Sequence, residues 1–427
     1  MIRRLFSLPV ARNAAILYAV QIGGYLVSLI TVPYLARVLT PAKFGLLAYA
    51  QDFIWYFVVL TDYSFNVTAT RKIAIQRDDV QAVSRIFSVV MTAKACLMTV
   101  GFLALCATVL IVPRFRAEWA LFCIVYLTVA SYVVFPLWYF QGLEKMHIVG
   151  IRDIVSKLAV LAAVFAFVHS ENDYRVAAAI QSGGLLVTAI LGLAAVPLAA
   201  PVRLIRPSLR ELRGLLSEGW HVFVSLFLAG VCPSTNVVIL GLIASPEQVG
   251  IYSAASRIIF PMRTMVGPLV TAVYPHVSHL ASSAPDRALR FLRRYAFLLS
   301  IPFLFLALGT LFFAPIAVRF LYGPRYAETA LLLQIMGVTP LLMSLTHCFS
   351  TYFLLAFGFT REWSRIMISG VFVNFLALGV TIWLLRPSLA LSVTMVAVDL
   401  FILSLSWAFY AARTGAGAAP AGKTLRG

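Results

Sequence analysis

Residues 39–45 read LTPAKFG and residues 243–250 read IASPEQVG, and each stretch opens a long hydrophobic segment. When the two prolines are aligned, the final glycines also coincide. The stretches lie about half a chain apart and indicate that one helical unit occurs twice. In the same register Asp52 matches Arg257, which sets two opposite charges at equal depth in the two segments. Charge inside a repeated membrane fold is typical of transporters.

The composition defines a membrane protein. Hydrophobic residues make up 61% of the 427 residues, charged residues only 12%, and the mean hydropathy is +0.93. A water-soluble core does not require so much apolar surface. Since a bilayer core about 30 Å thick takes roughly 20 apolar residues as a helix, the hydrophobic pattern predicts an all-α polytopic fold with about twelve transmembrane helices. The predicted spans are 13–36, 44–66, 86–112, 119–140, 147–168, 176–198, 219–243, 250–275, 294–318, 328–357, 366–385 and 389–411.

The basic residues predict the orientation. Of the 34 Lys and Arg residues, 22 lie in loops on the same side as the N-terminus and 8 lie in loops on the opposite side. The positive-inside rule therefore predicts that both termini are cytoplasmic. Much of the net charge of +18 is then a topology signal, and it does not indicate nucleic-acid binding. The arginine clusters within 203–213 and 287–294 favour contact with anionic lipid headgroups.

The predicted spans divide into two halves of six. Because six is even, both halves begin on the same side of the membrane, which predicts a parallel repeat with a central cavity between two six-helix bundles. The predicted divisions are 1–200 for the N-terminal bundle, 201–218 for a basic cytoplasmic connector, 219–412 for the C-terminal bundle and 413–427 for a flexible cytoplasmic tail.

The sequence predicts no metal site and no cofactor. All five cysteines fall within predicted spans, at no metal-ligand spacing, and four of the six histidines, His221, His276, His279 and His347, are scattered along the chain. No Walker A motif or Gly-rich nucleotide loop occurs. Uphill transport would therefore use an ion gradient, the membrane potential or a reaction elsewhere.

Short motifs in order along the chain carry a family resemblance. They are Asn13 with Gln21, Pro33-x-x-x-Arg37, Asp62 followed by Arg71-x-x-Ala74, PLWYFQGLEKM at 136–146, GIYSAA at 250–255, Pro268-Leu269 and Tyr274-Pro275. With these motifs the chain resembles the polysaccharide-biosynthesis (Wzx-type) lipid-linked oligosaccharide flippases, within the superfamily that includes multidrug and toxin extruders and lipid II flippases. Thr40, Ser64 and Asn236 depart from the family pattern, where Gly, Gly and Asp are common. A coupling mechanism that relies on a carboxylate at position 236 is therefore not expected for this chain.

The resemblance implies a function and its partners. The expected substrate is an undecaprenyl-pyrophosphate-linked oligosaccharide, moved by alternating access from the cytoplasmic to the outer leaflet of the bacterial inner membrane for O-antigen, capsule or exopolysaccharide assembly. Polysaccharide polymerase, chain-length machinery and a coupling H⁺ or Na⁺ are further partners that the resemblance leaves open. The polyprenyl tail can stay in lipid, whereas the pyrophosphate and sugars need a polar path.

The candidate substrate contacts are polar side chains in the spans. Arg257 is the leading candidate for pyrophosphate, because the guanidinium offers a bidentate fork. Asp52 lies on one helix face with Tyr49 and Tyr56, whose hydroxyls could hold sugars. The further candidates are Arg263, Asn13, Gln21, Asn236 and Lys94.

Each candidate also has a purely structural interpretation. Asp52 and Arg257 could form an ion pair that acts as a gate if it opens in one state. Asp62 is expected to pair with Arg71, and the long side chain of Lys94 to reach the cytoplasmic surface.

Two other function classes remain as alternatives. A multidrug or cation antiporter of the same superfamily would need acid-lined pockets, but the spans carry four bases against few central acids. A membrane polysaccharide polymerase or glycosyltransferase would need a reactive group at the outer face, where the predicted loops are short. The sequence therefore favours a transporter that is not an enzyme.

Overall fold

The computed structural model describes the backbone of residues 8–415; the side chains of 8–22, 228–233, 268, 269, 271, 272 and 415 lie outside this description. Throughout the described residues the fold is helical and contains no strand. Eight of the described helical segments are long and apolar enough to cross a membrane. The chain is thus an all-α polytopic membrane protein, as its composition predicts.

The eight segments correspond to eight of the twelve predicted spans. They are Pro41–Gln76, Val80–Ile111, Trp119–Gly142, Glu171–Ala194, Pro285–Leu321, Pro324–Leu355, Thr360–Leu384 and Pro387–Thr414. In the predicted first and seventh spans, the described apolar stretches are the shorter Gly23–Val38 and Ser234–Ile243. The number twelve and the cytoplasmic termini stay predictions.

Several predicted spans consist of more than one helix. The span 44–66 divides between α3 (Pro41–Asp62) and α4 (Phe65–Gln76), and the span 250–275 divides between α13 (Pro246–Thr264) and α14 (Val266–Ser283). The second division has a physical reason in Pro268, which lacks the N–H that would bond the carbonyl of a residue four positions earlier.

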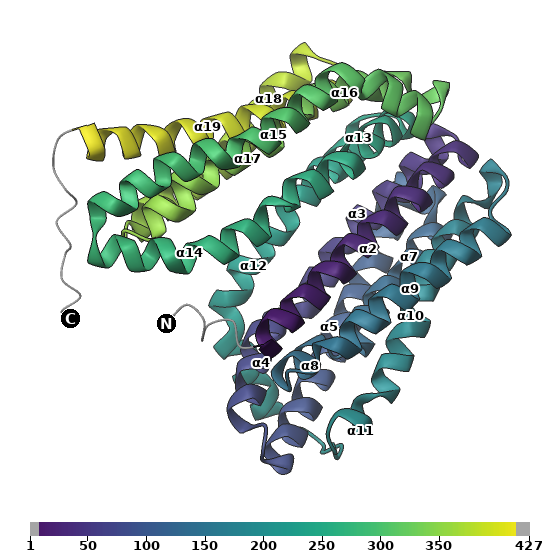
Figure 1. The fold of residues 1–427 in the computed structure, drawn as a ribbon. Coiled ribbons are helices and arrows are strands. Elements are labelled where there is room, and N and C mark those ends of the chain that lie inside the picture. Colours follow the sequence, from purple (N-terminus) through teal and green to yellow (C-terminus); the bar gives the residue numbers. More distant parts are fainter. Residues whose placement is uncertain (1–7, 416–427) are drawn as a thin grey trace. The chain divides into compact units, whose positions relative to one another are not determined.

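Contacts divide the chain into two compact units, Met1–Leu242 and Ile243–Gly427. In the first unit α2, α3, α7, α9 and α10 run side by side (Figure 1). Besides α3 and α4, the helices of this unit are α2 (Leu8–Val38), α5 (Val80–Ile111), α6 (Pro113–Ala117), α7 (Trp119–Val134), α8 (Leu137–Gly142), α9 (Met146–Phe167), η1 (Glu171–Asp173), α10 (Tyr174–Ala194), α11 (Val196–Ala199) and α12 (Leu209–Ile243).

The second unit is also a helical bundle. In it α15, α17, α18 and α19 lie together, and α13 packs against α16 (Figure 1). Besides α13 and α14, its helices are α15 (Pro285–Leu321), η2 (Pro324–Tyr326), α16 (Ala327–Met336), α17 (Thr339–Thr346), η3 (His347–Leu355), α18 (Thr360–Leu384) and α19 (Pro387–Gly415). The nine residues of η3 form a π-helix, a wide turn that is frequent at functional sites.

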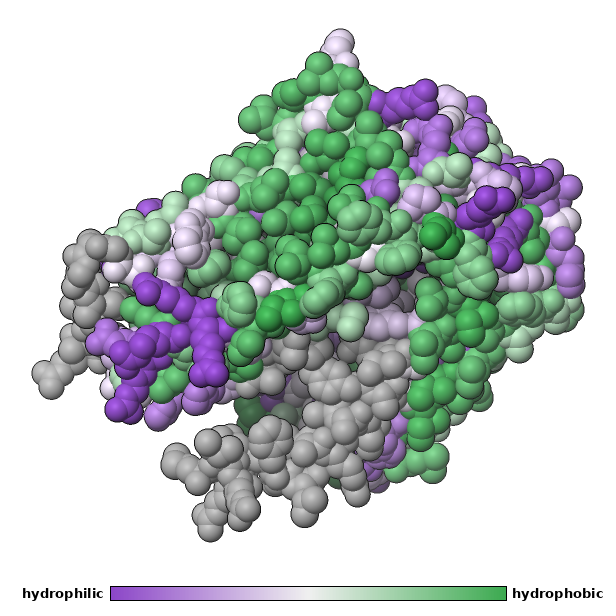
Figure 2. Space-filling view, turned by 45° about the horizontal axis from the view of Figure 1, so that its top comes forward, coloured by the Kyte–Doolittle hydropathy of each residue, from purple (hydrophilic) through white to green (hydrophobic). Residues whose placement is uncertain are grey.

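The outer surface is strongly apolar, as a bilayer requires. Figure 2 shows broad hydrophobic areas on one face of the molecule, with hydrophilic residues gathered toward its margins. Phe305 is 70% exposed, Phe312 69% and Trp383 91%. In water such exposure would favour aggregation, whereas acyl chains are an apolar solvent for these side chains.

The repeated stretches at 39–45 and 243–250 are helix starts. The Thr40 hydroxyl accepts a hydrogen bond from the backbone N–H of Lys43 at the start of α3. The Ser245 hydroxyl likewise accepts from the N–H of Gln248 at the start of α13. Each hydroxyl caps its helix, and the following proline occupies the first turn, where no N–H is needed. The Thr40 side chain is therefore the N-cap of α3.

Contacts of α12 explain why the units divide at Leu242 and not within the predicted connector. Helix α12 is bound to the first unit through residues in its first and last thirds. The ties are the Tyr63 Oη bond to the Leu216 carbonyl (2.8 Å), the Lys72–Glu218 ion pair (2.5 Å), the Tyr56 Oη bond to Thr235 Oγ1 (2.8 Å) and the Arg114 bond to the Leu242 carbonyl (3.0 Å). The division at 200 and 219 stays a prediction about sequence halves.

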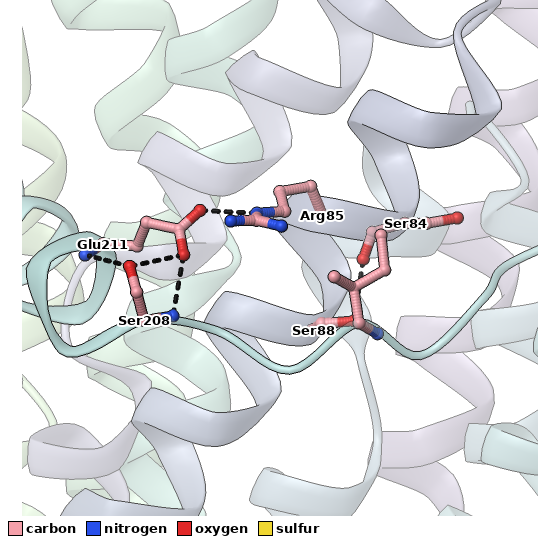
Figure 3. Close-up of polar contacts among 6 residues, drawn as sticks. Ser84, Arg85, Ser88, Ser208 and Glu211 are labelled. Atoms are coloured by element: carbon pink, nitrogen blue, oxygen red, sulfur yellow. Dashed lines mark hydrogen bonds and ion pairs between the residues drawn. The ribbon is translucent and has the colours of Figure 1, made fainter.

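The connector itself lies along α5 (Figure 3). The hydroxyls of Ser84 and Ser88 accept hydrogen bonds from the backbone N–H groups of Arg203 (3.0 Å) and Ile205 (2.9 Å). These bonds satisfy backbone groups of an extended segment that has no ladder or helix of its own. The basic connector is therefore attached to the first unit through its backbone.

The connector ends in a capping box at the start of α12. Ser208 donates its backbone N–H and its hydroxyl to Glu211 Oε2, and Glu211 returns its N–H to the Ser208 hydroxyl. The other carboxylate oxygen accepts from Arg85 of α5 (Figure 3). The Arg85 guanidinium, together with the Ser208 bonds, lowers the pKa of Glu211 to about 2.

The motif at 136–146 forms part of the core of the first unit. Trp138, Tyr139 and Phe140 of α8 are completely buried, so Trp138 is not the interface anchor that its position near a span boundary suggests. Helix α8 packs on α4, where Gly142 lies so close to Ile73 that a Cβ would approach Ile73 Cγ2 to 2.7 Å.

Candidate functional site

A buried ion pair lies inside the first unit. Lys94 of α5 donates to Asp62 Oδ1 of α3 at 2.8 Å and to the Tyr132 carbonyl of α7 at 2.7 Å. The Lys94 side chain is 1% exposed and that of Asp62 is 24% exposed. Asn66 also donates to the Asp62 carboxylate. An ammonium so deeply buried needs these acceptors, because desolvation of an unpaired charge costs several kcal/mol.

This geometry corrects two predictions. Lys94 does not reach the cytoplasmic surface, and Asp62 pairs with Lys94 and not with Arg71, whose side chain is exposed on α4. The reason is that α3 and α5 pack together, so the carboxylate at the end of α3 meets a lysine from the neighbouring helix.

The residue after Asp62 holds the chain in a strained conformation. Tyr63 has φ 51°, a region that favours glycine. Its ring stacks on Phe223 of α12 at a centroid distance of 4.2 Å, and its hydroxyl donates to the Leu216 carbonyl. These contacts from α12 stabilise the turn that places the Asp62 carboxylate. Ser64, with φ −127°, does not share the strain.

The face of α3 that carries Tyr49, Asp52 and Tyr56 lies along α12. Tyr56 Oη is 2.8 Å from Thr235 Oγ1, and Tyr49 lies against Gly241. Asp52, partly buried, is between them on the same face. Asn236, also partly buried, follows Thr235 on α12. The structure therefore brings Asp52, Tyr56 and Asn236 to one region of the first unit.

Tyr49 has a packing role in this region. It is 4% exposed, and its ring contacts Phe115 and Phe122. A Cβ on Gly241 would come within 2.1 Å of the Tyr49 ring, so only glycine allows this approach. In the described part of the chain the Tyr49 hydroxyl has no hydrogen-bond partner. The candidates Asn13 and Gln21 lie on α2, where their side chains fall outside the described residues.

In the second unit Arg257 lies on α13 with an exposed side chain. The neighbouring positions on its face, Gly250 and Ala254, are buried, and the Ala254 carbonyl accepts from the Tyr322 hydroxyl at 3.0 Å. Near the start of α13 this face therefore carries small, closely packed residues. It becomes accessible at Arg257.

Arg263 is held by an acid from another helix. Its two Nη atoms bind the two carboxylate oxygens of Asp399 on α19, and both side chains are largely buried. This fork-to-fork geometry is the strongest form of a side-chain ion pair. The purely structural role of Arg263 is thus an ion pair with Asp399. His347, the first residue of the π-helix η3, is 3.1 Å from Thr351 through its Nδ1 atom.

The site chemistry is that of polar groups held inside apolar helices. Within the described residues, no three His, Cys, Asp or Glu side chains gather as a metal site would require. Among the described acids in apolar helices, Asp62 and Asp399 each bind a base. Such an arrangement suits binding and passage of a polar group through a membrane.

Comparison with solved structures shows the class of fold. The chain resembles an inward-facing multidrug resistance MATE family transporter of the MOP superfamily, with a TM-score of 0.73, 12% identity and coverage of 92% of this chain and 95% of that one. It also resembles the lipid II flippase MurJ, with a TM-score of 0.66, 12% identity and coverage of 92% and 87%. The chain thus has the helical membrane fold of these proteins.

A family model identifies the chain more closely. The model described as "Polysaccharide biosynthesis protein" matches residues 10–281, well over half of the sequence, and the chain belongs to this family. The family resemblance read from the motifs is therefore confirmed.

Two curated relatives match nearly end to end. The "Putative O-antigen transporter" of Escherichia coli (strain K12) is 29% identical over 403 residues, which cover 94% of this chain and 97% of that protein. The protein of the same name from Shigella dysenteriae is 27% identical over 365 residues, 86% of this chain and 91% of that protein.

Sequence reasoning missed the two interhelical partnerships. Asp62, Lys94, Arg263 and Asp399 were each visible as charges in apolar segments. The usable signal was that opposite charges in membrane helices generally pair; which helix supplies the partner depends on packing that one sequence does not display.

Proposed function

We propose that this protein is a flippase that moves undecaprenyl-pyrophosphate-linked oligosaccharide from the cytoplasmic to the outer leaflet of the bacterial inner membrane, for assembly of a surface polysaccharide. The observation that carries this proposal is the match to O-antigen transporters over nearly the whole length of both chains. The fold shared with the lipid II flippase supports it, because lipid II flipping poses the same physical problem of a polar head on a lipid tail.

Arg257 is the proposed contact for the pyrophosphate. Its side chain is exposed on α13, at the point where a helix face that is closely packed near its start becomes accessible. Its guanidinium can donate two parallel hydrogen bonds to phosphate oxygens. Asp52 and Tyr56, with Asn236, are the proposed polar contacts for sugars in the first unit. Tyr49 supports this region by packing.

A multidrug antiporter is the second candidate, and the fold likeness to a MATE transporter is its support. A likeness at 12% identity bears on the fold alone. Cationic drugs need carboxylates that are available to bind them. In the described residues Asp62 and Asp399 are neutralised by Lys94 and Arg263, so these two acids favour the flippase over the antiporter.

Gene deletion followed by leaflet-resolved analysis of the glycolipid tests the proposed function. Complete lipid-linked units should build up on the cytoplasmic leaflet of the deletion strain. Accumulation of unpolymerised units on the outer leaflet would instead identify a polymerase defect, and unchanged glycolipid with new drug sensitivity would identify an antiporter.

Variants of Arg257 test the proposed site in the complemented strain. Arg257→Ala should abolish export at a normal protein level, and Arg257→Lys, which keeps the charge but lacks the fork, should restore part of it. Wild-type export by Arg257→Ala would remove this residue from the mechanism. Restored export by Arg257→Asp combined with Asp52→Arg would indicate that the two residues pair with each other.

A further inference from the structure

An open cavity of about 430 Å³ lies in the second unit, where α15, the π-helix and α19 meet. It is lined by Arg293, Ala296, Phe349, Trp407, Tyr410, Ala411 and Thr414. We infer that it binds an anionic phospholipid of the cytoplasmic leaflet, with the phosphate on Arg293 and the start of an acyl chain on the aromatic side chains. This inference does not depend on the proposed flippase activity.

Arg293 is positioned to bind a phosphate. Its Nε donates to the Tyr410 hydroxyl at 2.9 Å. In the described part of the chain no carboxylate pairs with Arg293, so its Nη groups can donate to an anion. The bond to Tyr410, which is 3% exposed, holds the guanidinium at the cavity and reduces the entropy lost when a headgroup binds.

The remaining lining suits the apolar part of a lipid. The Tyr410 ring contacts Phe349 at a centroid distance of 5.2 Å and Trp407 at 5.6 Å. Trp407 is 51% exposed, and amphipathic rings of this kind collect at the level of lipid headgroups. Phe349 belongs to the π-helix, so the wide turn contributes directly to the cavity.

Charge around the cavity selects an anionic headgroup. Arg287, Arg290, Arg293 and Arg294 follow one another along the first turns of α15. Arg413 lies on α19 next to Thr414, with its guanidinium over the rings of Phe359 and Phe409. The positive-inside rule assigns this end of both helices to the cytoplasmic side, where anionic lipids attract basic residues. A zwitterionic lipid would gain much less from this field.

Lipid binding by the purified full-length protein tests the inference. The measurement is quenching of tryptophan fluorescence by brominated phosphatidylglycerol or brominated phosphatidylethanolamine in mixed micelles. Wild-type protein should prefer phosphatidylglycerol, and a Trp407→Phe variant should lose the quenching component that belongs to the cavity. Equal quenching by both lipids, or no change in Trp407→Phe, would overturn the proposed site.

Two neighbouring arginines separate specific binding from general attraction. Arg293→Ala should weaken phosphatidylglycerol binding about tenfold, whereas Arg294→Ala, which removes the same charge from a side chain outside the cavity lining, should weaken it about twofold. Equal losses would mean that only diffuse electrostatic attraction exists. Arg293→Lys keeps the charge without the fork and should bind with intermediate affinity, which excludes misfolding as the cause of the loss.

The same measurement also distinguishes two sources of the phosphate, a bilayer phospholipid and the polyprenyl carrier. Undecaprenyl pyrophosphate added as a competitor should displace brominated phosphatidylglycerol no better than unlabelled phosphatidylglycerol does. Strong displacement would show that the cavity prefers the polyprenyl carrier and would overturn the assignment to a bilayer phospholipid.

Discussion

Asp62 and Lys94 form an ion pair between α3 and α5 in which the lysine side chain is almost completely buried. The pair receives further support from the Tyr132 carbonyl and from Asn66. The pairing therefore offsets the desolvation cost of both charges inside the apolar bundle. Each charge depends on the other for this compensation.

Removal of one partner of this pair should destabilise the protein strongly. Lys94→Met leaves the Asp62 carboxylate without its cation and should lower the free energy of unfolding by about 3–5 kcal/mol. The double variant Lys94→Met with Asp62→Asn removes both charges and should regain most of the loss. Thermal unfolding in detergent, followed by intrinsic fluorescence, gives the comparison. Equal stability of the single and double variants would contradict the pairing.

The pair of Arg263 and Asp399 should behave as a coupled unit in the second bundle. Asp399→Asn keeps the size of the side chain but removes the charge, and it should cost about 1–3 kcal/mol. A double-mutant cycle with Arg263→Lys measures the coupling. If Arg263 binds substrate phosphate instead, Arg263→Lys will reduce export while leaving the coupling energy near zero.

Gly241→Ala should disturb the packing of α12 on α3. The new Cβ would overlap the Tyr49 ring, and overpacking of this kind costs about 1–3 kcal/mol. Gly183→Ala is the matched control, because a Cβ there meets nothing within 4 Å and alanine favours the helix. Differential scanning fluorimetry should show a lower unfolding temperature for Gly241→Ala only. An unfolding temperature of that variant equal to the wild-type value would show that α12 does not pack against Tyr49.

The attachment of α12 to α5 should depend on pH through Glu211. Its pKa is about 2 in the folded protein, against an ordinary value of 4.5. A carboxyl with a lowered folded pKa stabilises the fold above its unfolded pKa, and this contribution disappears as the pH falls from about 4.5 toward 2.

Comparison of wild type with Glu211→Gln across pH 2–7 measures this contribution. The wild-type protein should unfold at a higher temperature than the variant above pH 5, and the difference should vanish near pH 2. A difference that does not change with pH would assign the effect to packing instead of charge.

Local features of the fold could be predicted from the sequence, and relations between helices could not. The helix starts after Thr40 and Ser245 follow from a cap hydroxyl, a proline and a hydrophobic run, all of which are adjacent along the chain. The partner of Lys94 lies on another helix, and its identity depends on the rotation of α3 against α5. The hydrophobic periodicity of either segment gives no information about that rotation.

The candidate face of α3 illustrates the same limit. Helical spacing correctly put Tyr49, Asp52 and Tyr56 on one face. The same spacing does not distinguish a face that lines a cavity from one that packs on a helix. Gly241, which admits the Tyr49 ring, lies far along the chain in a segment predicted to belong to the other half. Residues on this one face of α3 therefore have different roles, because some pack against apolar neighbours and others make polar contacts.

The capped starts of α3 and α13 have a consequence for how the gene can change in length. Asp52 and Arg257 each lie about 16 Å along the helix axis from the first helical proline, at a rise of 1.5 Å per residue. A codon inserted before Thr40 or Ser245 lengthens a loop and leaves that distance unchanged. A codon inserted after either cap would turn the charged side chain by about 100°. Insertions and deletions should therefore accumulate on one side of each cap during evolution and be removed by selection on the other.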